Sequence, residues 1–237
     1  GDTLLASGLA ITSGAGTLVD NGNGTWTYTP VANDDTGASF SYTITDNGTT
    51  NGVPDVKSVA ATATLDITPV NDAPAGTFAG AMPIAAEDTP FTISEALLLQ
   101  GYSDVEGNAL AVSGLTSNRG TVVNNGNGTF TITPSADYNG SMSLSYSVVD
   151  GNGGSLSASV GLVVTPVNDA PTTSAVTLSA VVEDSGARLI TQAQLLANAG
   201  DIEGNTLVAS SLAITSGAGT LVDNGNGTWS YTPAANE

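Results

Sequence analysis

Apolar and polar residues alternate along much of this chain, which is the pattern of a strand with one buried face. In segment 25–29, Trp26 and Tyr28 share one side and three threonines occupy the other. The same alternation occupies three further segments: 40–44, 144–148 and 156–164. Strands that alternate in this way usually form antiparallel sheets with one packed face and one face in water. The pattern therefore predicts an all-β fold.

Asn-Gly turns separate the alternating segments. The element Asp-Asn-Gly-Asn-Gly at 20–24 recurs, with Asn at its first position, at 124–128, and again unchanged at 223–227. Asn and Gly tolerate positive φ and close tight hairpins. Several short strands joined by such turns within about 100 residues indicate a β-sandwich. Only segments 94–101 and 191–200 look helical, with a Ser or Thr start, leucines and a terminal Gly, and each is long enough for two turns at most.

The chain is a tandem array. The stretch Thr-Pro-Val-Asn-Asp-Ala-Pro occupies 68–74 and 165–171, so one repeat is 97 residues long. Residues 1–34 match 204–237 at a constant offset of 203, and the middle copy matches less closely, so two domain types alternate. We predict three β-sandwich domains: 1–70, lacking its N-terminal strands, 71–167, complete, and 168–237, lacking its C-terminal strands. The opening Gly1 suggests a window cut from a longer protein.

The two proline-containing stretches mark the joints between domains. Their prolines fix φ and withhold backbone donors, so no sheet can run through them. A flexible linker would be rich in Gly and Ser. We call 68–74 the first joint and 165–171 the second joint, and interpret both as stiff connections whose Asn and Asp side chains can turn toward an ion.

The charge of the chain is strongly negative, with 22 Asp and Glu against 3 Lys and Arg, a net charge of −19 in 237 residues. Such a surface repels nucleic acid and anionic membranes, so neither is an expected partner. The absence of cysteine excludes disulfides and thiol chemistry. No apolar run approaches the ~18 residues of a membrane span, so membrane insertion is not expected.

Acidic residues recur at fixed places in the repeat. Asp-x-Glu-Gly-Asn occupies 104–108 and 201–205, and a Glu-Asp pair occupies 87–88 and 183–184. Two carboxylates ~4 Å apart repel by roughly 4 kcal/mol at an effective dielectric of 20. The carboxylates can stay apart in water, become protonated or share a cation. Oxygen ligands without His or Cys favour Ca²⁺ over a transition metal.

The ordered set of motifs resembles a known family. The quoted segments are Glu-Asp-Thr-Pro at 87–90, Leu-Leu to Ser-Asp-Val-Glu-Gly-Asn at 98–108, Asn-Gly-Asn-Gly-Thr-Phe at 125–130, Asp-Tyr-Asn-Gly at 137–140, Tyr-Ser-Val-Val-Asp-Gly-Asn-Gly-Gly at 146–154 and the second joint. Together they are similar to the bacterial cadherin-like tandem repeats of giant secreted (RTX-type) adhesins. The resemblance implies Ig-like Greek-key sandwiches arranged end to end, secretion, and Ca²⁺ between successive domains.

Cadherins place calcium ligands in the linker and in the two domains beside it. Carried over to this chain, the resemblance implies ligands at the first joint from Asn71, Asp72, Asp104, Glu106 and Asp150, with Asp34 or Asp35 from the preceding domain. At the second joint it implies Asn168, Asp169, Asp201, Glu203, Glu87 and Asp137. The linker is one ligand poorer than that of cadherins, and Asp-Tyr-Asn-Gly replaces an Asp-Arg-Glu type of motif, which leaves the number of ions per joint open.

Other interpretations apply to several of these residues. The Asn-Asp of each joint can form a solvated turn, and an acidic pair on an edge strand prevents edge-to-edge pairing. Asn-Gly-Thr triplets match a glycosylation sequon, although their positions fit hairpin turns. Trp26, Tyr28 and Trp229 could stack on sugars, but their alternation favours core packing. Paired carboxylates can hydrolyse glycosides, yet motifs repeated in every domain suit architecture better than an active site.

The sequence is therefore interpreted as a non-catalytic extender segment of a large secreted bacterial cell-surface adhesin, stiffened by Ca²⁺ at its joints and serving adhesion or biofilm formation. Its expected partners are neighbouring repeats, and the surface ligand of the parent protein is unknown. Three alternatives stay open: a lectin-like binding module, an accessory domain of a secreted hydrolase, and a filament subunit whose strands are completed by other copies head to tail.

Overall fold

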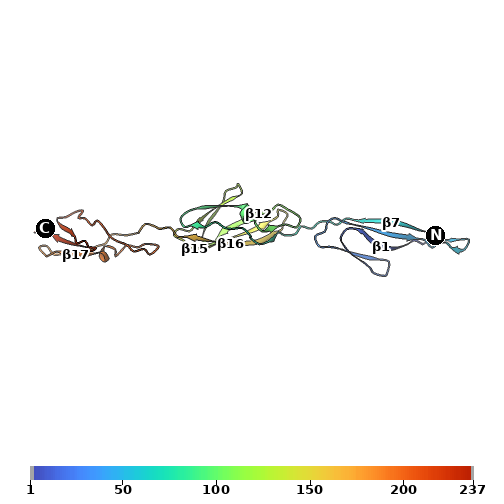
Figure 1. Cartoon of the computed structure of the whole chain (residues 1–237), viewed down its shortest axis with the longest axis horizontal. Coiled ribbons are helices and arrows are strands. Elements are labelled where there is room, and N and C mark those ends of the chain that lie inside the picture. Colours follow the sequence, from blue (N-terminus) through green and yellow to red (C-terminus); the bar gives the residue numbers. More distant parts are fainter. Residues whose placement is uncertain (1–2, 236–237) are drawn as a thin grey trace. The chain divides into compact units, whose positions relative to one another are not determined.

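The computed structural model describes residues 3–235, and nearly all of their regular structure is β-strand (Figure 1). The chain divides into two compact units. Unit 1 comprises the described part of Gly1–Ala81 together with Ser94–Leu115 and Ser145–Ser159. Unit 2 comprises Met82–Ile93, Thr116–Leu144 and the described part of Val160–Glu237. The middle of the sequence therefore contributes segments to both units.

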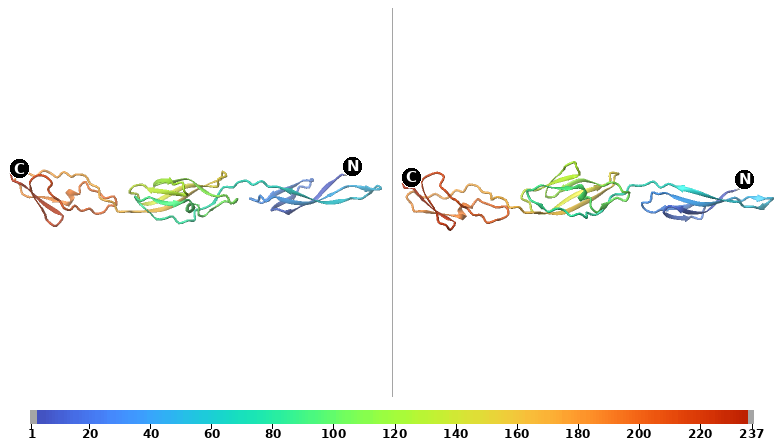
Figure 2. Two further views of the ribbon diagram at one scale, coloured as in Figure 1. Left: turned by 90° about the horizontal axis from the view of Figure 1, so that it is seen from above. Right: turned by 45° about the horizontal axis from the view of Figure 1, so that its top comes forward.

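Unit 1 contains a three-stranded antiparallel sheet in the order β1-β4-β7, seen from two further directions in Figure 2. Its strands are β1 (Leu5–Ser13), β4 (Ala38–Thr45) and β7 (Ser58–Leu65). Three small antiparallel pairs accompany it: β2 (Gly16–Asp20) with β3 (Trp26–Pro30), β5 (Thr49–Thr50) with β6 (Val53–Pro54), and β8 (Ala75–Gly76) with β11 (Tyr102–Ser103).

Unit 2 contains a second three-stranded antiparallel sheet, in the order β17-β19-β18. Its strands are β17 (Arg188–Thr191), β18 (Gly219–Asp223) and β19 (Thr228–Pro233). A similar sheet has the order β10-β14-β13 and consists of β10 (Phe91–Ser94), β13 (Gly120–Asn124) and β14 (Thr129–Pro134). The hairpins β2–β3, β13–β14 and β18–β19 thus recur at one place in each repeat.

The largest sheet has the order β12-β15-β16-β9. Its strands are β12 (Ala111–Ser117), β15 (Gly140–Val149), β16 (Ser155–Thr165) and β9 (Ala85–Ala86). The short β9 runs parallel to the end of β16, with Ala85 opposite Val164. The next residue, Glu87, donates its backbone N–H to the carbonyl of Thr165 at 3.0 Å. This pairing places Glu87 at the start of the second joint.

The predicted alternation is confirmed by burial. In β15, Leu144 and Val148 are fully buried and Tyr146 nearly so, whereas the serines between them are exposed or half-buried. The Tyr146 hydroxyl donates to the carbonyl of Leu98 at 2.9 Å. In the third repeat, buried Trp229 faces buried Ile190 across β17 and β19, so this tryptophan is a core residue, as its alternation predicted.

The two predicted helical segments each form a short helix, within the limit of two turns that their sequence indicated. Each is one turn, α1 (Glu95–Leu98) and α2 (Gln192–Leu195), because a Ser or Thr cap is followed by few residues before the chain re-enters a strand or a turn. Thr191 closes a capping box on Gln194. Within residues 3–235, no helix combines the length and apolar character needed to cross a membrane.

Candidate metal centre

The first joint has a fixed network on its C-terminal side. The side-chain amide of Asn71 donates to the carbonyl of Asp72 at 3.0 Å, and the backbone N–H of Asp72 donates to Glu106 Oε2 at 3.2 Å. The amide of Asn108 donates to Asn71 Oδ1 at 3.2 Å. The linker is therefore tied to the Asp-x-Glu-Gly-Asn element, which is itself folded by Asp104 Oδ1 accepting the backbone N–H groups of Glu106 and Asn108.

The second joint repeats this network. Asn168 donates to the carbonyl of Asp169 at 3.1 Å, Asp169 N–H donates to Glu203 Oε2 at 3.1 Å, and Asn205 donates to Asn168 Oδ1 at 3.0 Å. Asp201 Oδ1 accepts the backbone N–H of Asn205 at 2.8 Å. These distances match those of the first joint within a few tenths of an ångström, so the same residues at the same spacing fold the same way twice.

Glu87 braces the second joint from the preceding repeat. The residue is fully buried. Its Oε1 accepts the backbone N–H of Val167 at 2.7 Å, and its Oε2 accepts the side-chain amide of Asn139 at 3.1 Å. A buried carboxylate needs such partners because its desolvation is otherwise costly. Glu87 thus connects the middle repeat to the linker directly.

Two groups of carboxylates meet at Asp169. Carboxylate oxygens of Glu87, Asp169 and Glu203 lie within 4.8 Å of one another, and so do those of Asp88, Asp137 and Asp169. Asp88 and Asp137 have φ values of 57° and 55°, and the backbone N–H of Asp137 donates to Asp88 Oδ1 at 3.1 Å. Asp184 and Asn33, at the equivalent places of the other repeats, have the same left-handed backbone, with φ values of 56° and 63°, so this turn geometry recurs with the repeat.

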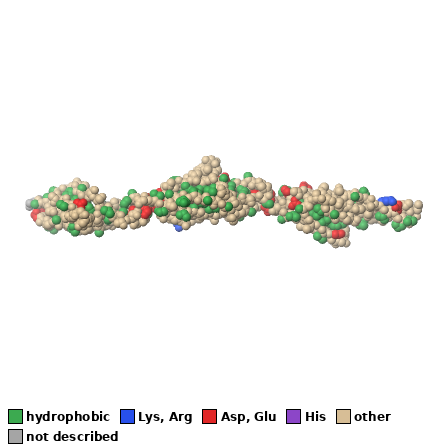
Figure 3. All heavy atoms as spheres, in the orientation of Figure 1, with side chains coloured by type: hydrophobic (Ala, Val, Ile, Leu, Met, Phe, Trp, Pro, Cys, Tyr) green, Lys and Arg blue, Asp and Glu red, His purple; other side chains and the backbone are tan. Residues whose placement is uncertain are grey.

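Within residues 3–235, the carboxylate of Asp169 lacks a compensating partner. Its Oδ2 is buried and has no hydrogen-bond partner. Burial, followed by the negative charges of Glu203, Asp88 and Asp137, raises the pKa of the Asp169 carboxyl. The one ion pair recorded among the described residues joins Lys57 to Asp55 at 2.6 Å, and Figure 3 shows few basic side chains beside the acidic ones on the face drawn. A bound cation would satisfy the orphaned oxygen and reduce the repulsion.

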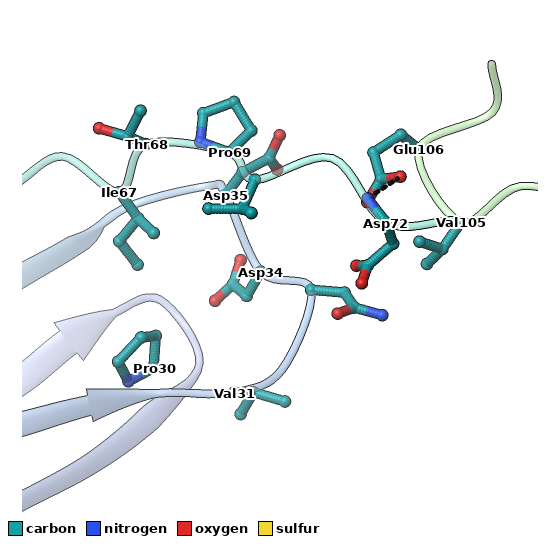
Figure 4. Close-up of a pocket in the computed structure, with 12 residues that line it drawn as sticks. Pro30, Val31, Asp34, Asp35, Ile67, Thr68, Pro69, Asp72, Val105 and Glu106 are labelled. Atoms are coloured by element: carbon teal, nitrogen blue, oxygen red, sulfur yellow. Dashed lines mark hydrogen bonds between the residues drawn. The ribbon is translucent and has the colours of Figure 1, made fainter. Parts of the chain in front are cut away.

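The first joint is more open. A pocket of about 490 Å³ lies between the joint and the loop after β3, and Figure 4 shows the Asp72 carboxylate facing this loop across it. Asp34 lines the pocket, but its oxygens accept hydrogen bonds from the hydroxyl and N–H of Thr36 and the N–H of Ala15, which lower its pKa. Asp35 also lines the pocket. Among the described residues, three carboxylates meet as closely only at the second joint.

Asp150 and Asp104 belong to the first joint by different contacts. Asp150 is buried, and its Oδ2 accepts the Asn71 amide at 2.8 Å. That bond, together with the N–H groups of Asn152 and Gly154, lowers the pKa of Asp150. Asp104 Oδ2 is buried without a hydrogen-bond partner, like Asp169 Oδ2 at the second joint. Each joint therefore contains one buried carboxylate oxygen that the described residues leave unsatisfied.

The structure brings four of the predicted second-joint residues together: Glu87, Asp137, Asp169 and Glu203. Asp201 and Asn168 instead support the loop through the hydrogen bonds given above. Two participants were missed by the sequence analysis. Asp88 was recognised as acidic but not assigned to the joint, and Asn139 was not considered. Asn139 matches Asp35 in the repeat register, at an offset of 104, and this match was the sequence signal that could have pointed to Asn139.

The donor set fits calcium. Every candidate ligand is a carboxylate or amide oxygen, and several carboxylates converge without a counter-charge, which suits the six to eight oxygen ligands of Ca²⁺. The chain has no His and no Cys, the residues that transition metals prefer. The buried, unpartnered oxygens of Asp104 and Asp169 are the atoms that a bound ion would satisfy.

Comparison with known proteins decides the family. The profile of the cadherin-like domain matches residues 1–68, 70–165 and 167–237. The chain belongs to the cadherin-like domain family. Its sheets are accordingly those of an Ig-like β-sandwich, in agreement with the predicted fold class. Cadherin-like domains generally bind Ca²⁺ and are typically non-catalytic, and the acidic groups at the second joint are suited to hold such an ion.

Two solved structures are similar to this cadherin-like chain. An endo-fucoidan hydrolase of glycoside hydrolase family 107 is 18% identical, over 96% of this chain and 35% of its own, with a TM-score of 0.32. The human desmocollin-1 ectodomain is 12% identical, over 99% of this chain and 46% of its own, with a TM-score of 0.31. The chain spans less than half the length of either. No curated protein matches the chain.

Proposed function

We propose that this cadherin-like chain is a non-catalytic extender segment of a large secreted bacterial adhesin, in which Ca²⁺ binds at the joints and fixes the angle between successive repeats. The observation that carries the proposal is the convergence of two carboxylate groups on Asp169, whose Oδ2 is buried and unpartnered. The adhesin context rests on the ordered motifs and the family, and the division into three repeats is part of the same proposal.

The second joint suits this role because its acidic groups come from three parts of the sequence. Glu87, Asp88 and Asp137 precede the linker, Asp169 lies within it, and Glu203 follows it. Without a cation these carboxylates repel one another, and repulsion favours any motion that separates them. With a cation, the same groups become ligands of one centre. Calcium would thereby convert a loosened connection into a fixed one.

The first joint is proposed as a second, more weakly preorganised centre. It has the same network on its C-terminal side and the same kind of orphaned oxygen, on Asp104. Its preceding repeat contributes Asp35 across an open pocket, whereas Asp34 is occupied by local hydrogen bonds. Closing this pocket around an ion requires movement, which reduces the net affinity. Extracellular calcium sites of this kind bind with dissociation constants of ~10⁻⁴–10⁻³ M.

Calorimetric titration with CaCl₂ tests the proposal. The Asp169→Asn variant should lose the tighter class of sites, because one amide oxygen replaces the carboxylate shared by both groups. Asp223→Asn is the matched control: it removes one exposed acidic charge at a hairpin turn, where the middle repeat has Asn124 in the equivalent place. Equal calcium binding by the two variants would contradict the assignment of the site, and no binding by the parent chain would contradict the calcium proposal itself.

A further inference from the structure

The recurring hairpin turns contain two asparagines with different environments. In the first hairpin, Asn21 uses its side-chain amide to donate to the hydroxyls of Thr25 at 3.0 Å and Thr27 at 3.2 Å. Asn125 and Asn224 make the corresponding bonds at 2.9–3.1 Å. The first asparagine of each turn is therefore a structural residue whose nitrogen is occupied.

The second asparagine of each turn presents its nitrogen outward. Asn23 Oδ1 accepts both the N–H of Thr25 at 3.2 Å and its hydroxyl at 2.6 Å. A backbone N–H is always a donor, so it fixes the oxygen of the Asn23 amide toward the turn and leaves Nδ2 on the other side. Asn226 repeats both contacts with Thr228, at 3.2 and 2.7 Å. The hydroxyl of Thr129 makes the same contact to Asn127 Oδ1 at 2.6 Å.

We propose that these turns are acceptor sites for N-linked glycosylation at Asn23, Asn127 and Asn226. Each begins an Asn-Gly-Thr triplet, the sequence that N-glycosylating enzymes require, and each asparagine is exposed. The triplet recurs at one place in all three repeats. A hairpin role and an acceptor role are compatible here because the turn is held by the first asparagine and by the oxygen of the second, not by the nitrogen of the second.

The co-substrate is a nucleotide-activated sugar. The anomeric carbon of the sugar forms a bond to Nδ2, and its bond to the diphosphate oxygen breaks with the electron pair leaving on the nucleotide diphosphate. One amide proton passes to the departing diphosphate or to water. The step needs no oxidant or reductant.

Two of the turns are open enough for a sugar. A Cβ placed on Gly24 or Gly128, the residues after Asn23 and Asn127, would meet no heavy atom within 4 Å. At the third turn the corresponding atom on Gly227 would lie 3.2 Å from Gln192 Cγ. We therefore expect Asn23 and Asn127 to be modified more completely than Asn226.

The chain contains an internal contrast. Asn139 also begins a sequon, Asn-Gly-Ser, but its side-chain amide donates to the buried carboxylate of Glu87 at 3.1 Å. Its nitrogen is therefore occupied at the second joint. Asn47 begins a further Asn-Gly-Thr triplet, outside the repeated turns. It is exposed and accepts the N–H of Thr3 through its oxygen at 2.7 Å, so it can be modified like Asn23.

The acceptor turns are separate from the proposed calcium centre. Gly120 pairs with Pro134 at the base of β13–β14, and Asp137 follows that base, whereas Asn127 lies at the far end of the hairpin. Five residues of strand place the two ends about 16 Å apart. A sugar on Asn127 should leave calcium binding unchanged.

The test is incubation of the folded 237-residue chain with a soluble N-glycosyltransferase and UDP-glucose, followed by site-resolved mass spectrometry. We expect a hexose on Asn23 and Asn127, less on Asn226, and roughly tenfold less on Asn139 than on Asn127, because the charged hydrogen bond to Glu87 must open first. Asn23→Gln and Asn127→Gln should each remove one hexose, and Asn21→Gln should remove none. A synthetic peptide of residues 120–134 confirms that the enzyme and donor are active. Modification of this peptide without modification of Asn23 or Asn127 in the folded chain would overturn the assignment, and so would a hexose on Asn139 equal to that on Asn127.

Discussion

Glu203 both orients Asp169 and repels it. The backbone N–H of Asp169 donates to Glu203 Oε2 at 3.1 Å, while carboxylate oxygens of the two residues lie within 4.8 Å of each other. The hydrogen bond holds the linker in place, and the charge of Glu203 contributes to the raised pKa of Asp169. A cation bound between the two carboxylates would offset their repulsion, which is the physical reason for proposing Ca²⁺ here.

Asp169→Asn should have opposite effects with and without calcium. A carboxyl group whose pKa is raised by folding destabilises the folded state at neutral pH, where the group is ionised. This destabilisation vanishes at low pH, where the group is protonated in both the folded and the unfolded state. In chelator at neutral pH, the neutral variant should therefore melt at the same temperature as the parent or higher. In 10 mM CaCl₂ the parent should gain about 1.4–2.7 kcal/mol per site, as follows from a Kd of ~10⁻³–10⁻⁴ M, and the variant should lose that site's gain. Calorimetric unfolding measures both, and a variant destabilised in chelator would argue against repulsion at Asp169.

Glu87→Ala should destabilise the protein even without calcium. It removes a fully buried carboxylate that accepts both the N–H of Val167 at 2.7 Å and the side-chain amide of Asn139 at 3.1 Å. Leaving partly buried donors without their charged acceptor costs about 1–3 kcal/mol. Denaturant unfolding in chelator measures the loss. Glu183→Ala, the exposed equivalent in the third repeat, is the control and should change stability little; equal losses in both variants would show that burial of Glu87 is not the cause.

Gly154→Ala should loosen the first joint. A Cβ at this glycine would collide with Asp150 Oδ2, the atom that accepts the Asn71 amide. The side chain of Asp150 must then move, and overpacking of this kind costs about 1–3 kcal/mol. Gly161→Ala, whose Cβ would meet only the Met142 carbonyl at 3.9 Å, is the matched control. Amide NMR spectra should show shifts at Asn71 in the first variant only, and unchanged Asn71 signals would contradict the contact.

Asp46 should make stability depend on acid pH. Its Oδ1 accepts the N–H of Lys57 at 2.8 Å and that of Gly48 at 3.1 Å, and these bonds lower its pKa from 3.8. The stabilisation is fully present above the unfolded pKa and is lost as the pH falls through the lower folded value. Acid unfolding of Asp46→Asn, which cannot titrate here, should lack this component. If the free energies of unfolding of parent and variant changed in parallel with pH, a contribution from Asp46 would be excluded.

Much of the fold could be predicted from the sequence because buried and exposed side chains alternate along the strands with a period of two residues. The alternation in β15 predicted its buried row, and the Asn-Gly elements predicted the three hairpins. Strand formation itself was less predictable. Leu5–Ser13 forms β1 by pairing with β4, whereas the closely similar segment 208–216 forms no described strand. A strand exists only with its partner, and local sequence does not specify the partner.

The candidate site was predicted in part for a similar reason. The linker residues and Glu203 were found because they lie in conspicuous repeated motifs. Asp88 and Asn139 were missed because their role depends on the parallel pairing of β9 with β16 and on a left-handed backbone. Neither feature has a clear local sequence signal, and the match of Asn139 to Asp35 in the repeat register indicates only a shared place in the repeat. The closeness of the carboxylates at the second joint, compared with the open pocket at the first, is likewise a property of the fold.

The central claim is that Ca²⁺ fixes the joints, and small-angle X-ray scattering with and without chelator tests it most directly. In millimolar CaCl₂ we predict a longer maximum dimension and a narrower distance distribution than in chelator. Asp169→Asn in CaCl₂ should fall between the two, because its second joint is loosened while its first joint can still bind the ion. A distance distribution that stays the same when calcium is removed would contradict the account.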